Sequence, residues 1–159
     1  MKVTIFTSNQ PRHLTLINRL ASISDTTYAI MECSTVVPGL VEDFFRKSAT
    51  MKEYFSSVMA AEQRLFGNLS FMKGNVRSLC IRSGDLNFLQ QHQIQDALES
   101  DVYVVFGASY IKGWLIDYLV ERGAGTSTWG SRRTTAAPPK TSGHSTTGSP
   151  STSVRHYTC

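Results

Sequence analysis

Cysteine is scarce in this sequence: only Cys33, Cys80 and Cys159 are present, and they are widely spaced. No C-x-x-C pair or Cys/His cluster has the spacing of a metal site, so neither a zinc module nor a disulfide framework is indicated. No apolar run approaches the roughly twenty residues of a membrane span, and the short apolar stretch at the N-terminus is no signal peptide. We therefore expect a cytoplasmic protein that binds no metal and no membrane.

Residues 125–159 lack Leu, Ile, Met, Phe and acidic residues, and sixteen of these thirty-five residues are Ser or Thr. Such a segment buries too little apolar surface to offset chain entropy, so we expect a disordered tail after a folded part at residues 1–124. The whole net charge of +4 lies in the tail, because residues 1–124 carry equal numbers of acidic and basic residues. The basic pI therefore does not favour a nucleic-acid partner for the folded part.

Apolar runs and amphipathic stretches alternate along residues 1–124. Four apolar runs predict buried strands, at Lys2–Thr7, Tyr28–Cys33, Val76–Ile81 and Val102–Phe106. Helical spacing of apolar residues predicts helices around Leu14–Leu20, over residues 41–66 as one long helix or two, near Phe88–Leu98, and over Tyr110–Glu121. The run Val102–Phe106 is apolar throughout, which predicts the central strand. The alternation predicts an α/β, Rossmann-like, doubly wound and mostly parallel sheet.

In such a sheet, ligands bind beyond the carboxyl ends of the strands, near the point where the strand order reverses. The loop after the first strand contains no glycine, so it is neither a dinucleotide-binding fingerprint nor a P-loop. Its candidate substrate contacts are Ser8, Asn9, Arg12 and His13, which could hold an anion at the start of a helix. Equally, Ser8 or Asn9 caps that helix, Arg12 is solvated and His13 is structural.

The second candidate loop is GASYIKG, after the fourth strand. Its small residues let a ligand approach the backbone, whose amides and carbonyls can bind a flat heterocycle. Alternatively, Gly107 serves only the dihedral angles of a tight turn. The candidate contacts to a bound cofactor are Gly107, Ala108, Ser109, Tyr110, Ile111 and Lys112. Nothing in residues 1–124 brings a nucleophile and a base, or two carboxylates, to motif spacing, so no catalytic residue is assigned.

The stretch VYVVFGASYIKGWLIDYLVERGA resembles the formyltransferase family that uses 10-formyltetrahydrofolate. It looks like the N-terminal domain shared by methionyl-tRNA formyltransferases and sugar-amine formyltransferases, and KVTIFTSNQPRHLTLI is similar to that family's first strand and helix. The resemblance covers residues 1–124. It implies that 10-formyltetrahydrofolate is the formyl donor, that Ala108–Lys112 lines the pteridine pocket, and that the acceptor is an amine of an amino sugar or an aminoacyl-tRNA.

After residue 124 this chain departs from the family, which continues with a strand ending Asn-x-His and a Pro-Tyr-Arg-Gly-type turn. The genetic code can test for a change of reading frame. When the third base of each codon is read with the first two bases of the next, Gly125–Gly130 permits Asn-Ile-His-Met-Gly, and Ser131–Ala137 permits Ile-Ser-Pro-Tyr-Tyr-Arg-Gly. The opposite frame fails, because a Thr-Thr junction read that way never encodes Tyr. We therefore interpret residues 125–159 as an out-of-frame translation of the catalytic half.

On this interpretation the chain is a truncated formyltransferase that is inactive as translated, because the family's catalytic Asn, His and downstream Asp are absent. His144 and His156 are products of the shifted frame and do not correspond to the catalytic His. Two alternatives stay open. One is a non-enzymatic folate- or nucleotide-binding Rossmann-like domain with a genuine Ser/Thr/Pro-rich linker. The other is an unrelated Rossmann-like nucleotide binder.

Overall fold

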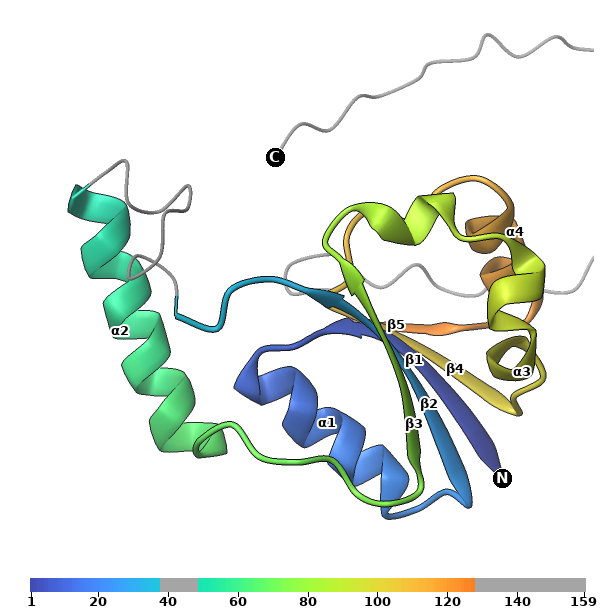
Figure 1. The fold of residues 1–159 in the computed structure, drawn as a ribbon, viewed down its shortest axis with the longest axis horizontal. Coiled ribbons are helices and arrows are strands. Elements are labelled where there is room, and N and C mark those ends of the chain that lie inside the picture. The colour runs from blue at the N-terminus through green and yellow to red at the C-terminus, as the bar shows by residue number, and fades with distance from the viewer. Residues whose placement is uncertain (38–48, 128–159) are drawn as a thin grey trace, which may run out of the picture. The chain divides into compact units, whose positions relative to one another are not determined.

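The computed structural model describes residues 1–37 and 49–127, which form a parallel sheet with helices on both faces (Figure 1). The strands are β1 (Lys2–Ser8), β2 (Thr26–Cys33), β3 (Val76–Arg82), β4 (Val102–Phe106) and β5 (Gly125–Ser127). They lie in the order β3-β2-β1-β4-β5, and every neighbouring pair is parallel. This arrangement confirms the predicted α/β, Rossmann-like fold.

The helices differ from the sequence prediction mainly in their starting points. They are α1 (Pro11–Ala21), α2 (Ala49–Phe66), the 3-10 helices η2 (Asp85–Phe88) and η3 (Gln91–Ile94), α3 (Gln95–Leu98) and α4 (Trp114–Glu121). The helix expected near Phe88–Leu98 is confirmed only in part, because the extended backbone at Leu89 and Gln90 separates η2 from η3 and α3. The helix expected from Tyr110 begins only at Trp114, because Gly113 has a φ of +67°.

The core consists of two apolar layers, one on each face of the sheet, because successive side chains of a strand point to opposite faces. On the first face, Ile5, Ala29 and Met31 pack with Ile17 of α1. On the other face, the buried residues come from three strands, the helices α3 and α4, and the turns between: Phe6, Ile30, Leu86, Ile94, Ala97, Leu98, Tyr103, Ile111, Leu115 and Leu119. Both layers meet at β1, the middle strand.

The prediction that Val102–Phe106 is the central strand is wrong. β1 holds the centre, and its residues Val3–Thr7 are all buried, whereas in β4 only Tyr103 is buried. The outer neighbour of β4 is the three-residue β5, which pairs with Val104–Phe106. A continuous apolar run therefore marks a strand inside the sheet without identifying the most buried one.

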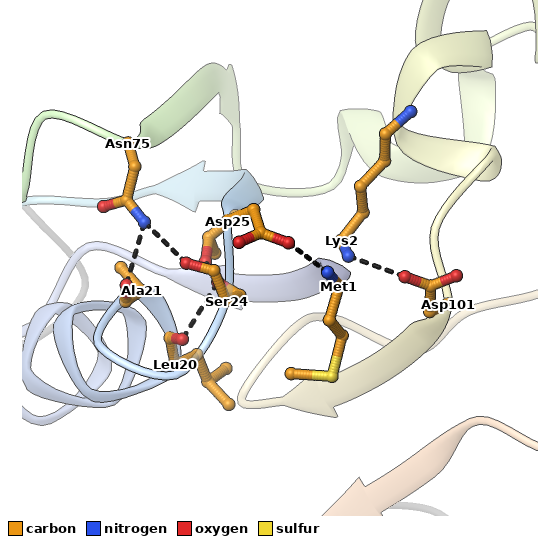
Figure 2. Close-up of polar contacts among 9 residues, drawn as sticks. Met1, Lys2, Leu20, Ala21, Ser24, Asp25, Asn75 and Asp101 are labelled. Atoms are coloured by element: carbon orange, nitrogen blue, oxygen red, sulfur yellow. Dashed lines mark hydrogen bonds and ion pairs between the residues drawn. The ribbon is translucent and has the colours of Figure 1, made fainter.

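Polar contacts close the amino edge of the sheet (Figure 2). The N-terminal amine pairs with Asp25 after α1, and the Lys2 N–H donates to Asp101 before β4 (2.7 Å). The Asn75 side chain donates to the carbonyls of Ala21 (2.8 Å) and Ser24 (3.0 Å). These bonds tie the turns before β2, β3 and β4 to one another at the edge opposite the predicted ligand site.

The sheet continues three residues past the domain boundary expected at residue 124, because Gly125–Ser127 forms β5. The predicted disordered tail otherwise falls on residues 128–159, which lie outside the described residues. The first part of the helix predicted over residues 41–66 also lies outside them, since the description resumes with α2.

Candidate functional site

The structure brings the two candidate loops to the same edge of the sheet. β1 pairs with β2 on one side and with β4 on the other, so the strand order reverses between β1 and β4. In open parallel sheets, ligands bind in the crevice at such a reversal. The β1–α1 loop (residues 9–10) and the β4–α4 loop (residues 107–113) both begin there, at the carboxyl ends of their strands.

The polar side chains of the β1–α1 loop bind the backbone that follows β2. Asn9 donates its side-chain amide to the Ser34 carbonyl (2.8 Å) and accepts the Ser34 N–H (3.1 Å), and Ser8 donates its hydroxyl to the Asn9 side chain (3.4 Å). The expectation that Ser8 or Asn9 caps α1 is wrong. The N-cap is Gln10, whose side chain makes no capping bond, so Asn9 holds two loops together instead.

Arg12, in the first turn of α1, forms an ion pair with Glu62 of α2. The Arg12 side chain is 38% exposed and the Glu62 side chain 13% exposed. Burial lowers the pKa of the Arg12 guanidinium from its ordinary value. Arg12, which the sequence analysis proposes as a contact to an anionic ligand, is therefore already paired with the carboxylate of Glu62.

His13 is buried at the point of reversal, with 1% of its surface exposed. Its Nδ1 lies 2.7 Å from the Thr7 hydroxyl and 3.2 Å from the Phe106 carbonyl oxygen, and that hydroxyl donates to the same carbonyl (2.7 Å). Because the hydroxyl proton is used in this way, Nδ1 carries the imidazole proton and Nε2 is an acceptor. Within the described part of the chain, Nε2 has no hydrogen-bond partner.

The imidazole of His13 is neutral at pH 7. Burial and the neighbouring Arg12 charge lower the pKa of His13 from 6.5 to about 4, against the opposing effect of its hydrogen bond to Phe106. Its ring also lies 4.9 Å from the Phe106 ring, measured between centroids. His13 thus links Thr7 at the end of β1 to Phe106 at the end of β4, and fixes these two strand ends relative to each other.

Gly107 packs directly against this imidazole. It has a φ of +68°, and a Cβ atom added to it would lie 2.0 Å from Cε1 of His13. Both its dihedral angle and its close approach to the ring therefore require glycine. The turn and the packing against His13 are therefore sufficient to explain glycine at position 107, and no contact with a ligand is needed to explain it.

The next residues of the β4–α4 loop alternate between the core and the surface. Ile111 is buried, and Ala108 packs against the same apolar layer. Tyr110 is 85% exposed, and Lys112 is also exposed. The loop is thus anchored by the apolar side chains of Ala108 and Ile111, while those of Tyr110 and Lys112 face solvent.

Two polar side chains that sequence reasoning missed hold this loop. Glu32, near the end of β2, accepts hydrogen bonds from the amide and the hydroxyl of Ser109. Asn87, in η2, donates to the Tyr110 carbonyl and accepts the Lys112 N–H, both at 2.8 Å. The loop therefore has a defined backbone conformation although it contains no regular secondary structure.

A groove of about 650 Å³ lies beside the β1–α1 loop, between the start of α1 and α2. Described residues that line it include Gln10, Pro11, Val36, Met59, Gln63 and Leu69. Its volume falls in the range of small-molecule sites. The described lining includes no residue of the β4–α4 loop, so this groove is separate from that loop.

Comparison with known proteins gives no family. No family model, no curated protein and no solved structure matches this chain. Among the described residues, no group of three or more His, Cys, Asp or Glu side chains could hold a metal ion. In the same part of the chain, no helix is both long and apolar enough to cross a bilayer.

Proposed function

We propose that this chain derives from the formyltransferases that use 10-formyltetrahydrofolate. The sequence of β4, its loop and α4 carries the proposal, because this stretch resembles the family most closely. The position of the loop supports it: residues 107–113 follow β4 at the reversal of strand order, where α/β sheets bind ligands.

In the proposed reaction, the nitrogen of an acceptor amine attacks the formyl carbon and produces a tetrahedral oxyanion. The family's Asn would stabilise this oxyanion, and its His would carry protons. The backbone of Ala108–Lys112 would hold the pteridine ring of the donor. The acceptor would be an amino sugar or an aminoacyl-tRNA.

The chain as translated should bind the donor without using it. Binding alone lowers no barrier, because only interactions that strengthen in the transition state accelerate a reaction. In the described structure, His13 Nδ1 bonds to β1 and β4, and Glu32 bonds to Ser109, so these groups hold the fold together. Because these side chains already bond within the protein, we favour a role in binding over a role in catalysis. The non-enzymatic alternative also assigns a binding role.

The coding DNA provides the first test. We expect the shifted frame to remain open after codon 124 and to encode Asn-Ile-His followed by Tyr-Tyr-Arg-Gly. A stop codon before Tyr-Tyr-Arg-Gly would contradict the proposal.

The second test compares the present chain with the product of the frame-restored gene. We expect formyl transfer to an amine only from the restored protein, and a loss of about a hundredfold or more when its Asn or His is replaced by Ala. Both chains should bind 5-formyltetrahydrofolate, a non-reactive probe. Binding by both without transfer by either would favour the non-enzymatic folate-binding alternative, and folate-dependent transfer by the present chain would contradict the proposed inactivity.

A further inference from the structure

Glu32 is a buried carboxylate that accepts three hydrogen bonds. It is 3% exposed. Its Oε1 accepts the Gly84 N–H (2.8 Å) and the Ser109 hydroxyl (2.8 Å), and its Oε2 accepts the Ser109 N–H (2.6 Å). Among the described residues, no cationic side chain forms an ion pair with it. A buried carboxylate is costly unless its oxygens are bonded, so these three donors are what stabilise it there.

The bonds to Ser109 span the site. In the sheet, β1 lies between β2 and β4, yet Glu32 belongs to β2 and Ser109 to the loop after β4. The β4–α4 loop therefore passes over the carboxyl end of β1 and reaches β2. Glu32 holds the loop across the reversal at which a ligand is expected.

Glu32 also acts on the loop by a second route. Its bond to Gly84 fixes the turn from which η2 begins, since Gly84 is the N-cap of η2. Asn87 lies in η2, and its side chain donates to the Tyr110 carbonyl and accepts the Lys112 N–H, both at 2.8 Å. One carboxylate thus supports both sets of bonds that define the loop.

We propose that Glu32 is the positioning residue of the β4–α4 loop, which sets the backbone groups that the loop offers to a ligand. Ser109 and Lys112 use their amides internally. In the described part of the chain, the amides of Ala108 and Tyr110 donate no hydrogen bond, and Glu32 holds them in place for ligand acceptors. The inference rests on the proposed function where it concerns folate. The claim that Glu32 positions the loop does not depend on the proposed function.

Glu32→Gln is the direct test, because it keeps the size of the side chain and replaces one acceptor oxygen by a donor. All three partners of Glu32 are donors. In either orientation of the new amide, the N–H of Gly84 or of Ser109 therefore faces another donor. The matched control is Thr4→Val: Thr4 is fully buried and bonds to the Ala97 carbonyl (2.6 Å) and to Ser100 (2.8 Å), in the first half of β1.

Hydrogen exchange measured on the full chain reads out the loop without any ligand. We expect the amides of Ser109 and Lys112 to exchange at least tenfold faster in Glu32→Gln, relative to the amide of Ile5 in the same variant. A lost bond to a charged group has about this effect. Thr4→Val should leave the relative rates unchanged. Equal relative rates in the two variants would overturn the inference.

Ser109→Ala covers the case in which Glu32→Gln does not fold. It removes the bond from the hydroxyl and leaves the bond from the Ser109 amide. We expect an intermediate effect, of roughly threefold, on exchange at Lys112, consistent with the loss of one of several bonds. An unchanged rate at Lys112 would show that the contact does not position the loop.

Titration with 5-formyltetrahydrofolate separates this inference from the proposed function. If the wild-type chain binds the probe, its affinity should fall at least tenfold in Glu32→Gln and stay unchanged in Thr4→Val; equal affinity in all three would overturn the positioning role. If the wild-type chain does not bind the probe, the folate proposal fails, and hydrogen exchange alone decides whether Glu32 positions the loop.

Discussion

The helices α1 and α2 both carry an apolar stripe, more sharply confined to one face in α1, and they have very different surroundings. α1 buries His13, Ile17 and Ala21 against the sheet. None of the eighteen residues of α2 is buried, and this helix packs chiefly against α1, as Figure 1 shows at the left. An apolar stripe therefore predicts that a helix forms, but it does not predict how deeply the helix packs.

The stripe of α2 contains one charged residue, which accounts for part of this difference. Glu62 lies between the turns that carry Val58 and Phe66, on the same side of the helix by its spacing of four residues. It pairs there with Arg12. The apolar residues around this pair stay partly accessible, with Leu65 71% and Phe66 41% exposed. An ion pair thus joins α2 to α1 where a buried helix would have apolar contacts.

The largest expected effect is that of truncating the buried face of α1. Ile17 is fully buried among Ile5, Ala29 and Met31. Ile17→Ala should lower the free energy of unfolding by about 3 to 4 kcal/mol, because it removes apolar contacts and leaves a cavity. Urea unfolding of the two proteins measures the difference. A loss below about 1 kcal/mol would mean that α1 packs loosely on the sheet.

Acid should destabilise the protein through His13, which also lies in α1. The pKa of His13 is about 4 in the folded chain and 6.5 in its ordinary state. Between these values the unfolded chain binds a proton that the folded chain does not. The free energy of unfolding should therefore be constant above pH 6.5 and fall by up to about 3 kcal/mol as the pH decreases to 4.

The control for this pH dependence is His13→Asn, which removes the titrating group. Its baseline stability will be lower, so the comparison concerns the slope of stability against pH. We expect the slope between pH 6.5 and 4 to become shallower in the variant. The same slope in both proteins would assign the acid sensitivity to other groups.

Breaking the ion pair between the two helices should have a smaller and local effect. Glu62→Gln leaves Arg12, which is 38% exposed, without its carboxylate. The cost should be about 1 kcal/mol, between that of an exposed and that of a buried pair. Hydrogen exchange should accelerate about fivefold for amides of α2, with α1 unchanged. Equal acceleration in both helices would show that they unfold as one unit.

The smallest effect is expected at the exposed face of α2. Leu65 is 71% exposed, so Leu65→Ala should change the free energy of unfolding by less than about 0.5 kcal/mol. Urea unfolding under the conditions used for Ile17→Ala makes the two values comparable. A loss above about 1 kcal/mol would mean that a partner or a second copy covers this face in solution.

The sequence was sufficient for β1 to β4 and their parallel arrangement, because apolar runs separated by helical patterns have few other solutions; it did not predict β5, which falls in the expected tail. It failed where the outcome depended on single backbone angles. Gly113 delays α4, and the extended Leu89 and Gln90 divide the predicted helix before β4. It also failed to find the central strand, since burial in β4 depends on what lies beside it, which composition does not specify.

The candidate loops were likewise predictable, because both follow strands whose carboxyl ends are expected to meet. Glu32 was not found. Its partners Gly84 and Ser109 are distant in sequence, and an isolated acid near the end of a strand resembles any solvated residue. Strand alternation was the available signal: Glu32 shares a face with the buried Ile30. This alternation indicates that the Glu32 side chain is directed toward the core layer, where a carboxylate requires hydrogen-bond donors.

The contact between Gly107 and His13 also constrains how this sequence can evolve. A Cβ at position 107 would lie 2.0 Å from Cε1 of the imidazole, so the two positions cannot vary independently although they are far apart in the chain. A lineage could exchange His13 for a smaller residue first, and admit afterwards at 107 only a side chain that tolerates a φ of +68°, such as Asn or Asp. The reverse order would pass through an intermediate with two atoms in the same place. Among relatives of this protein, glycine at 107 should therefore accompany histidine at 13, while a smaller residue at 13 should be found with or without that glycine.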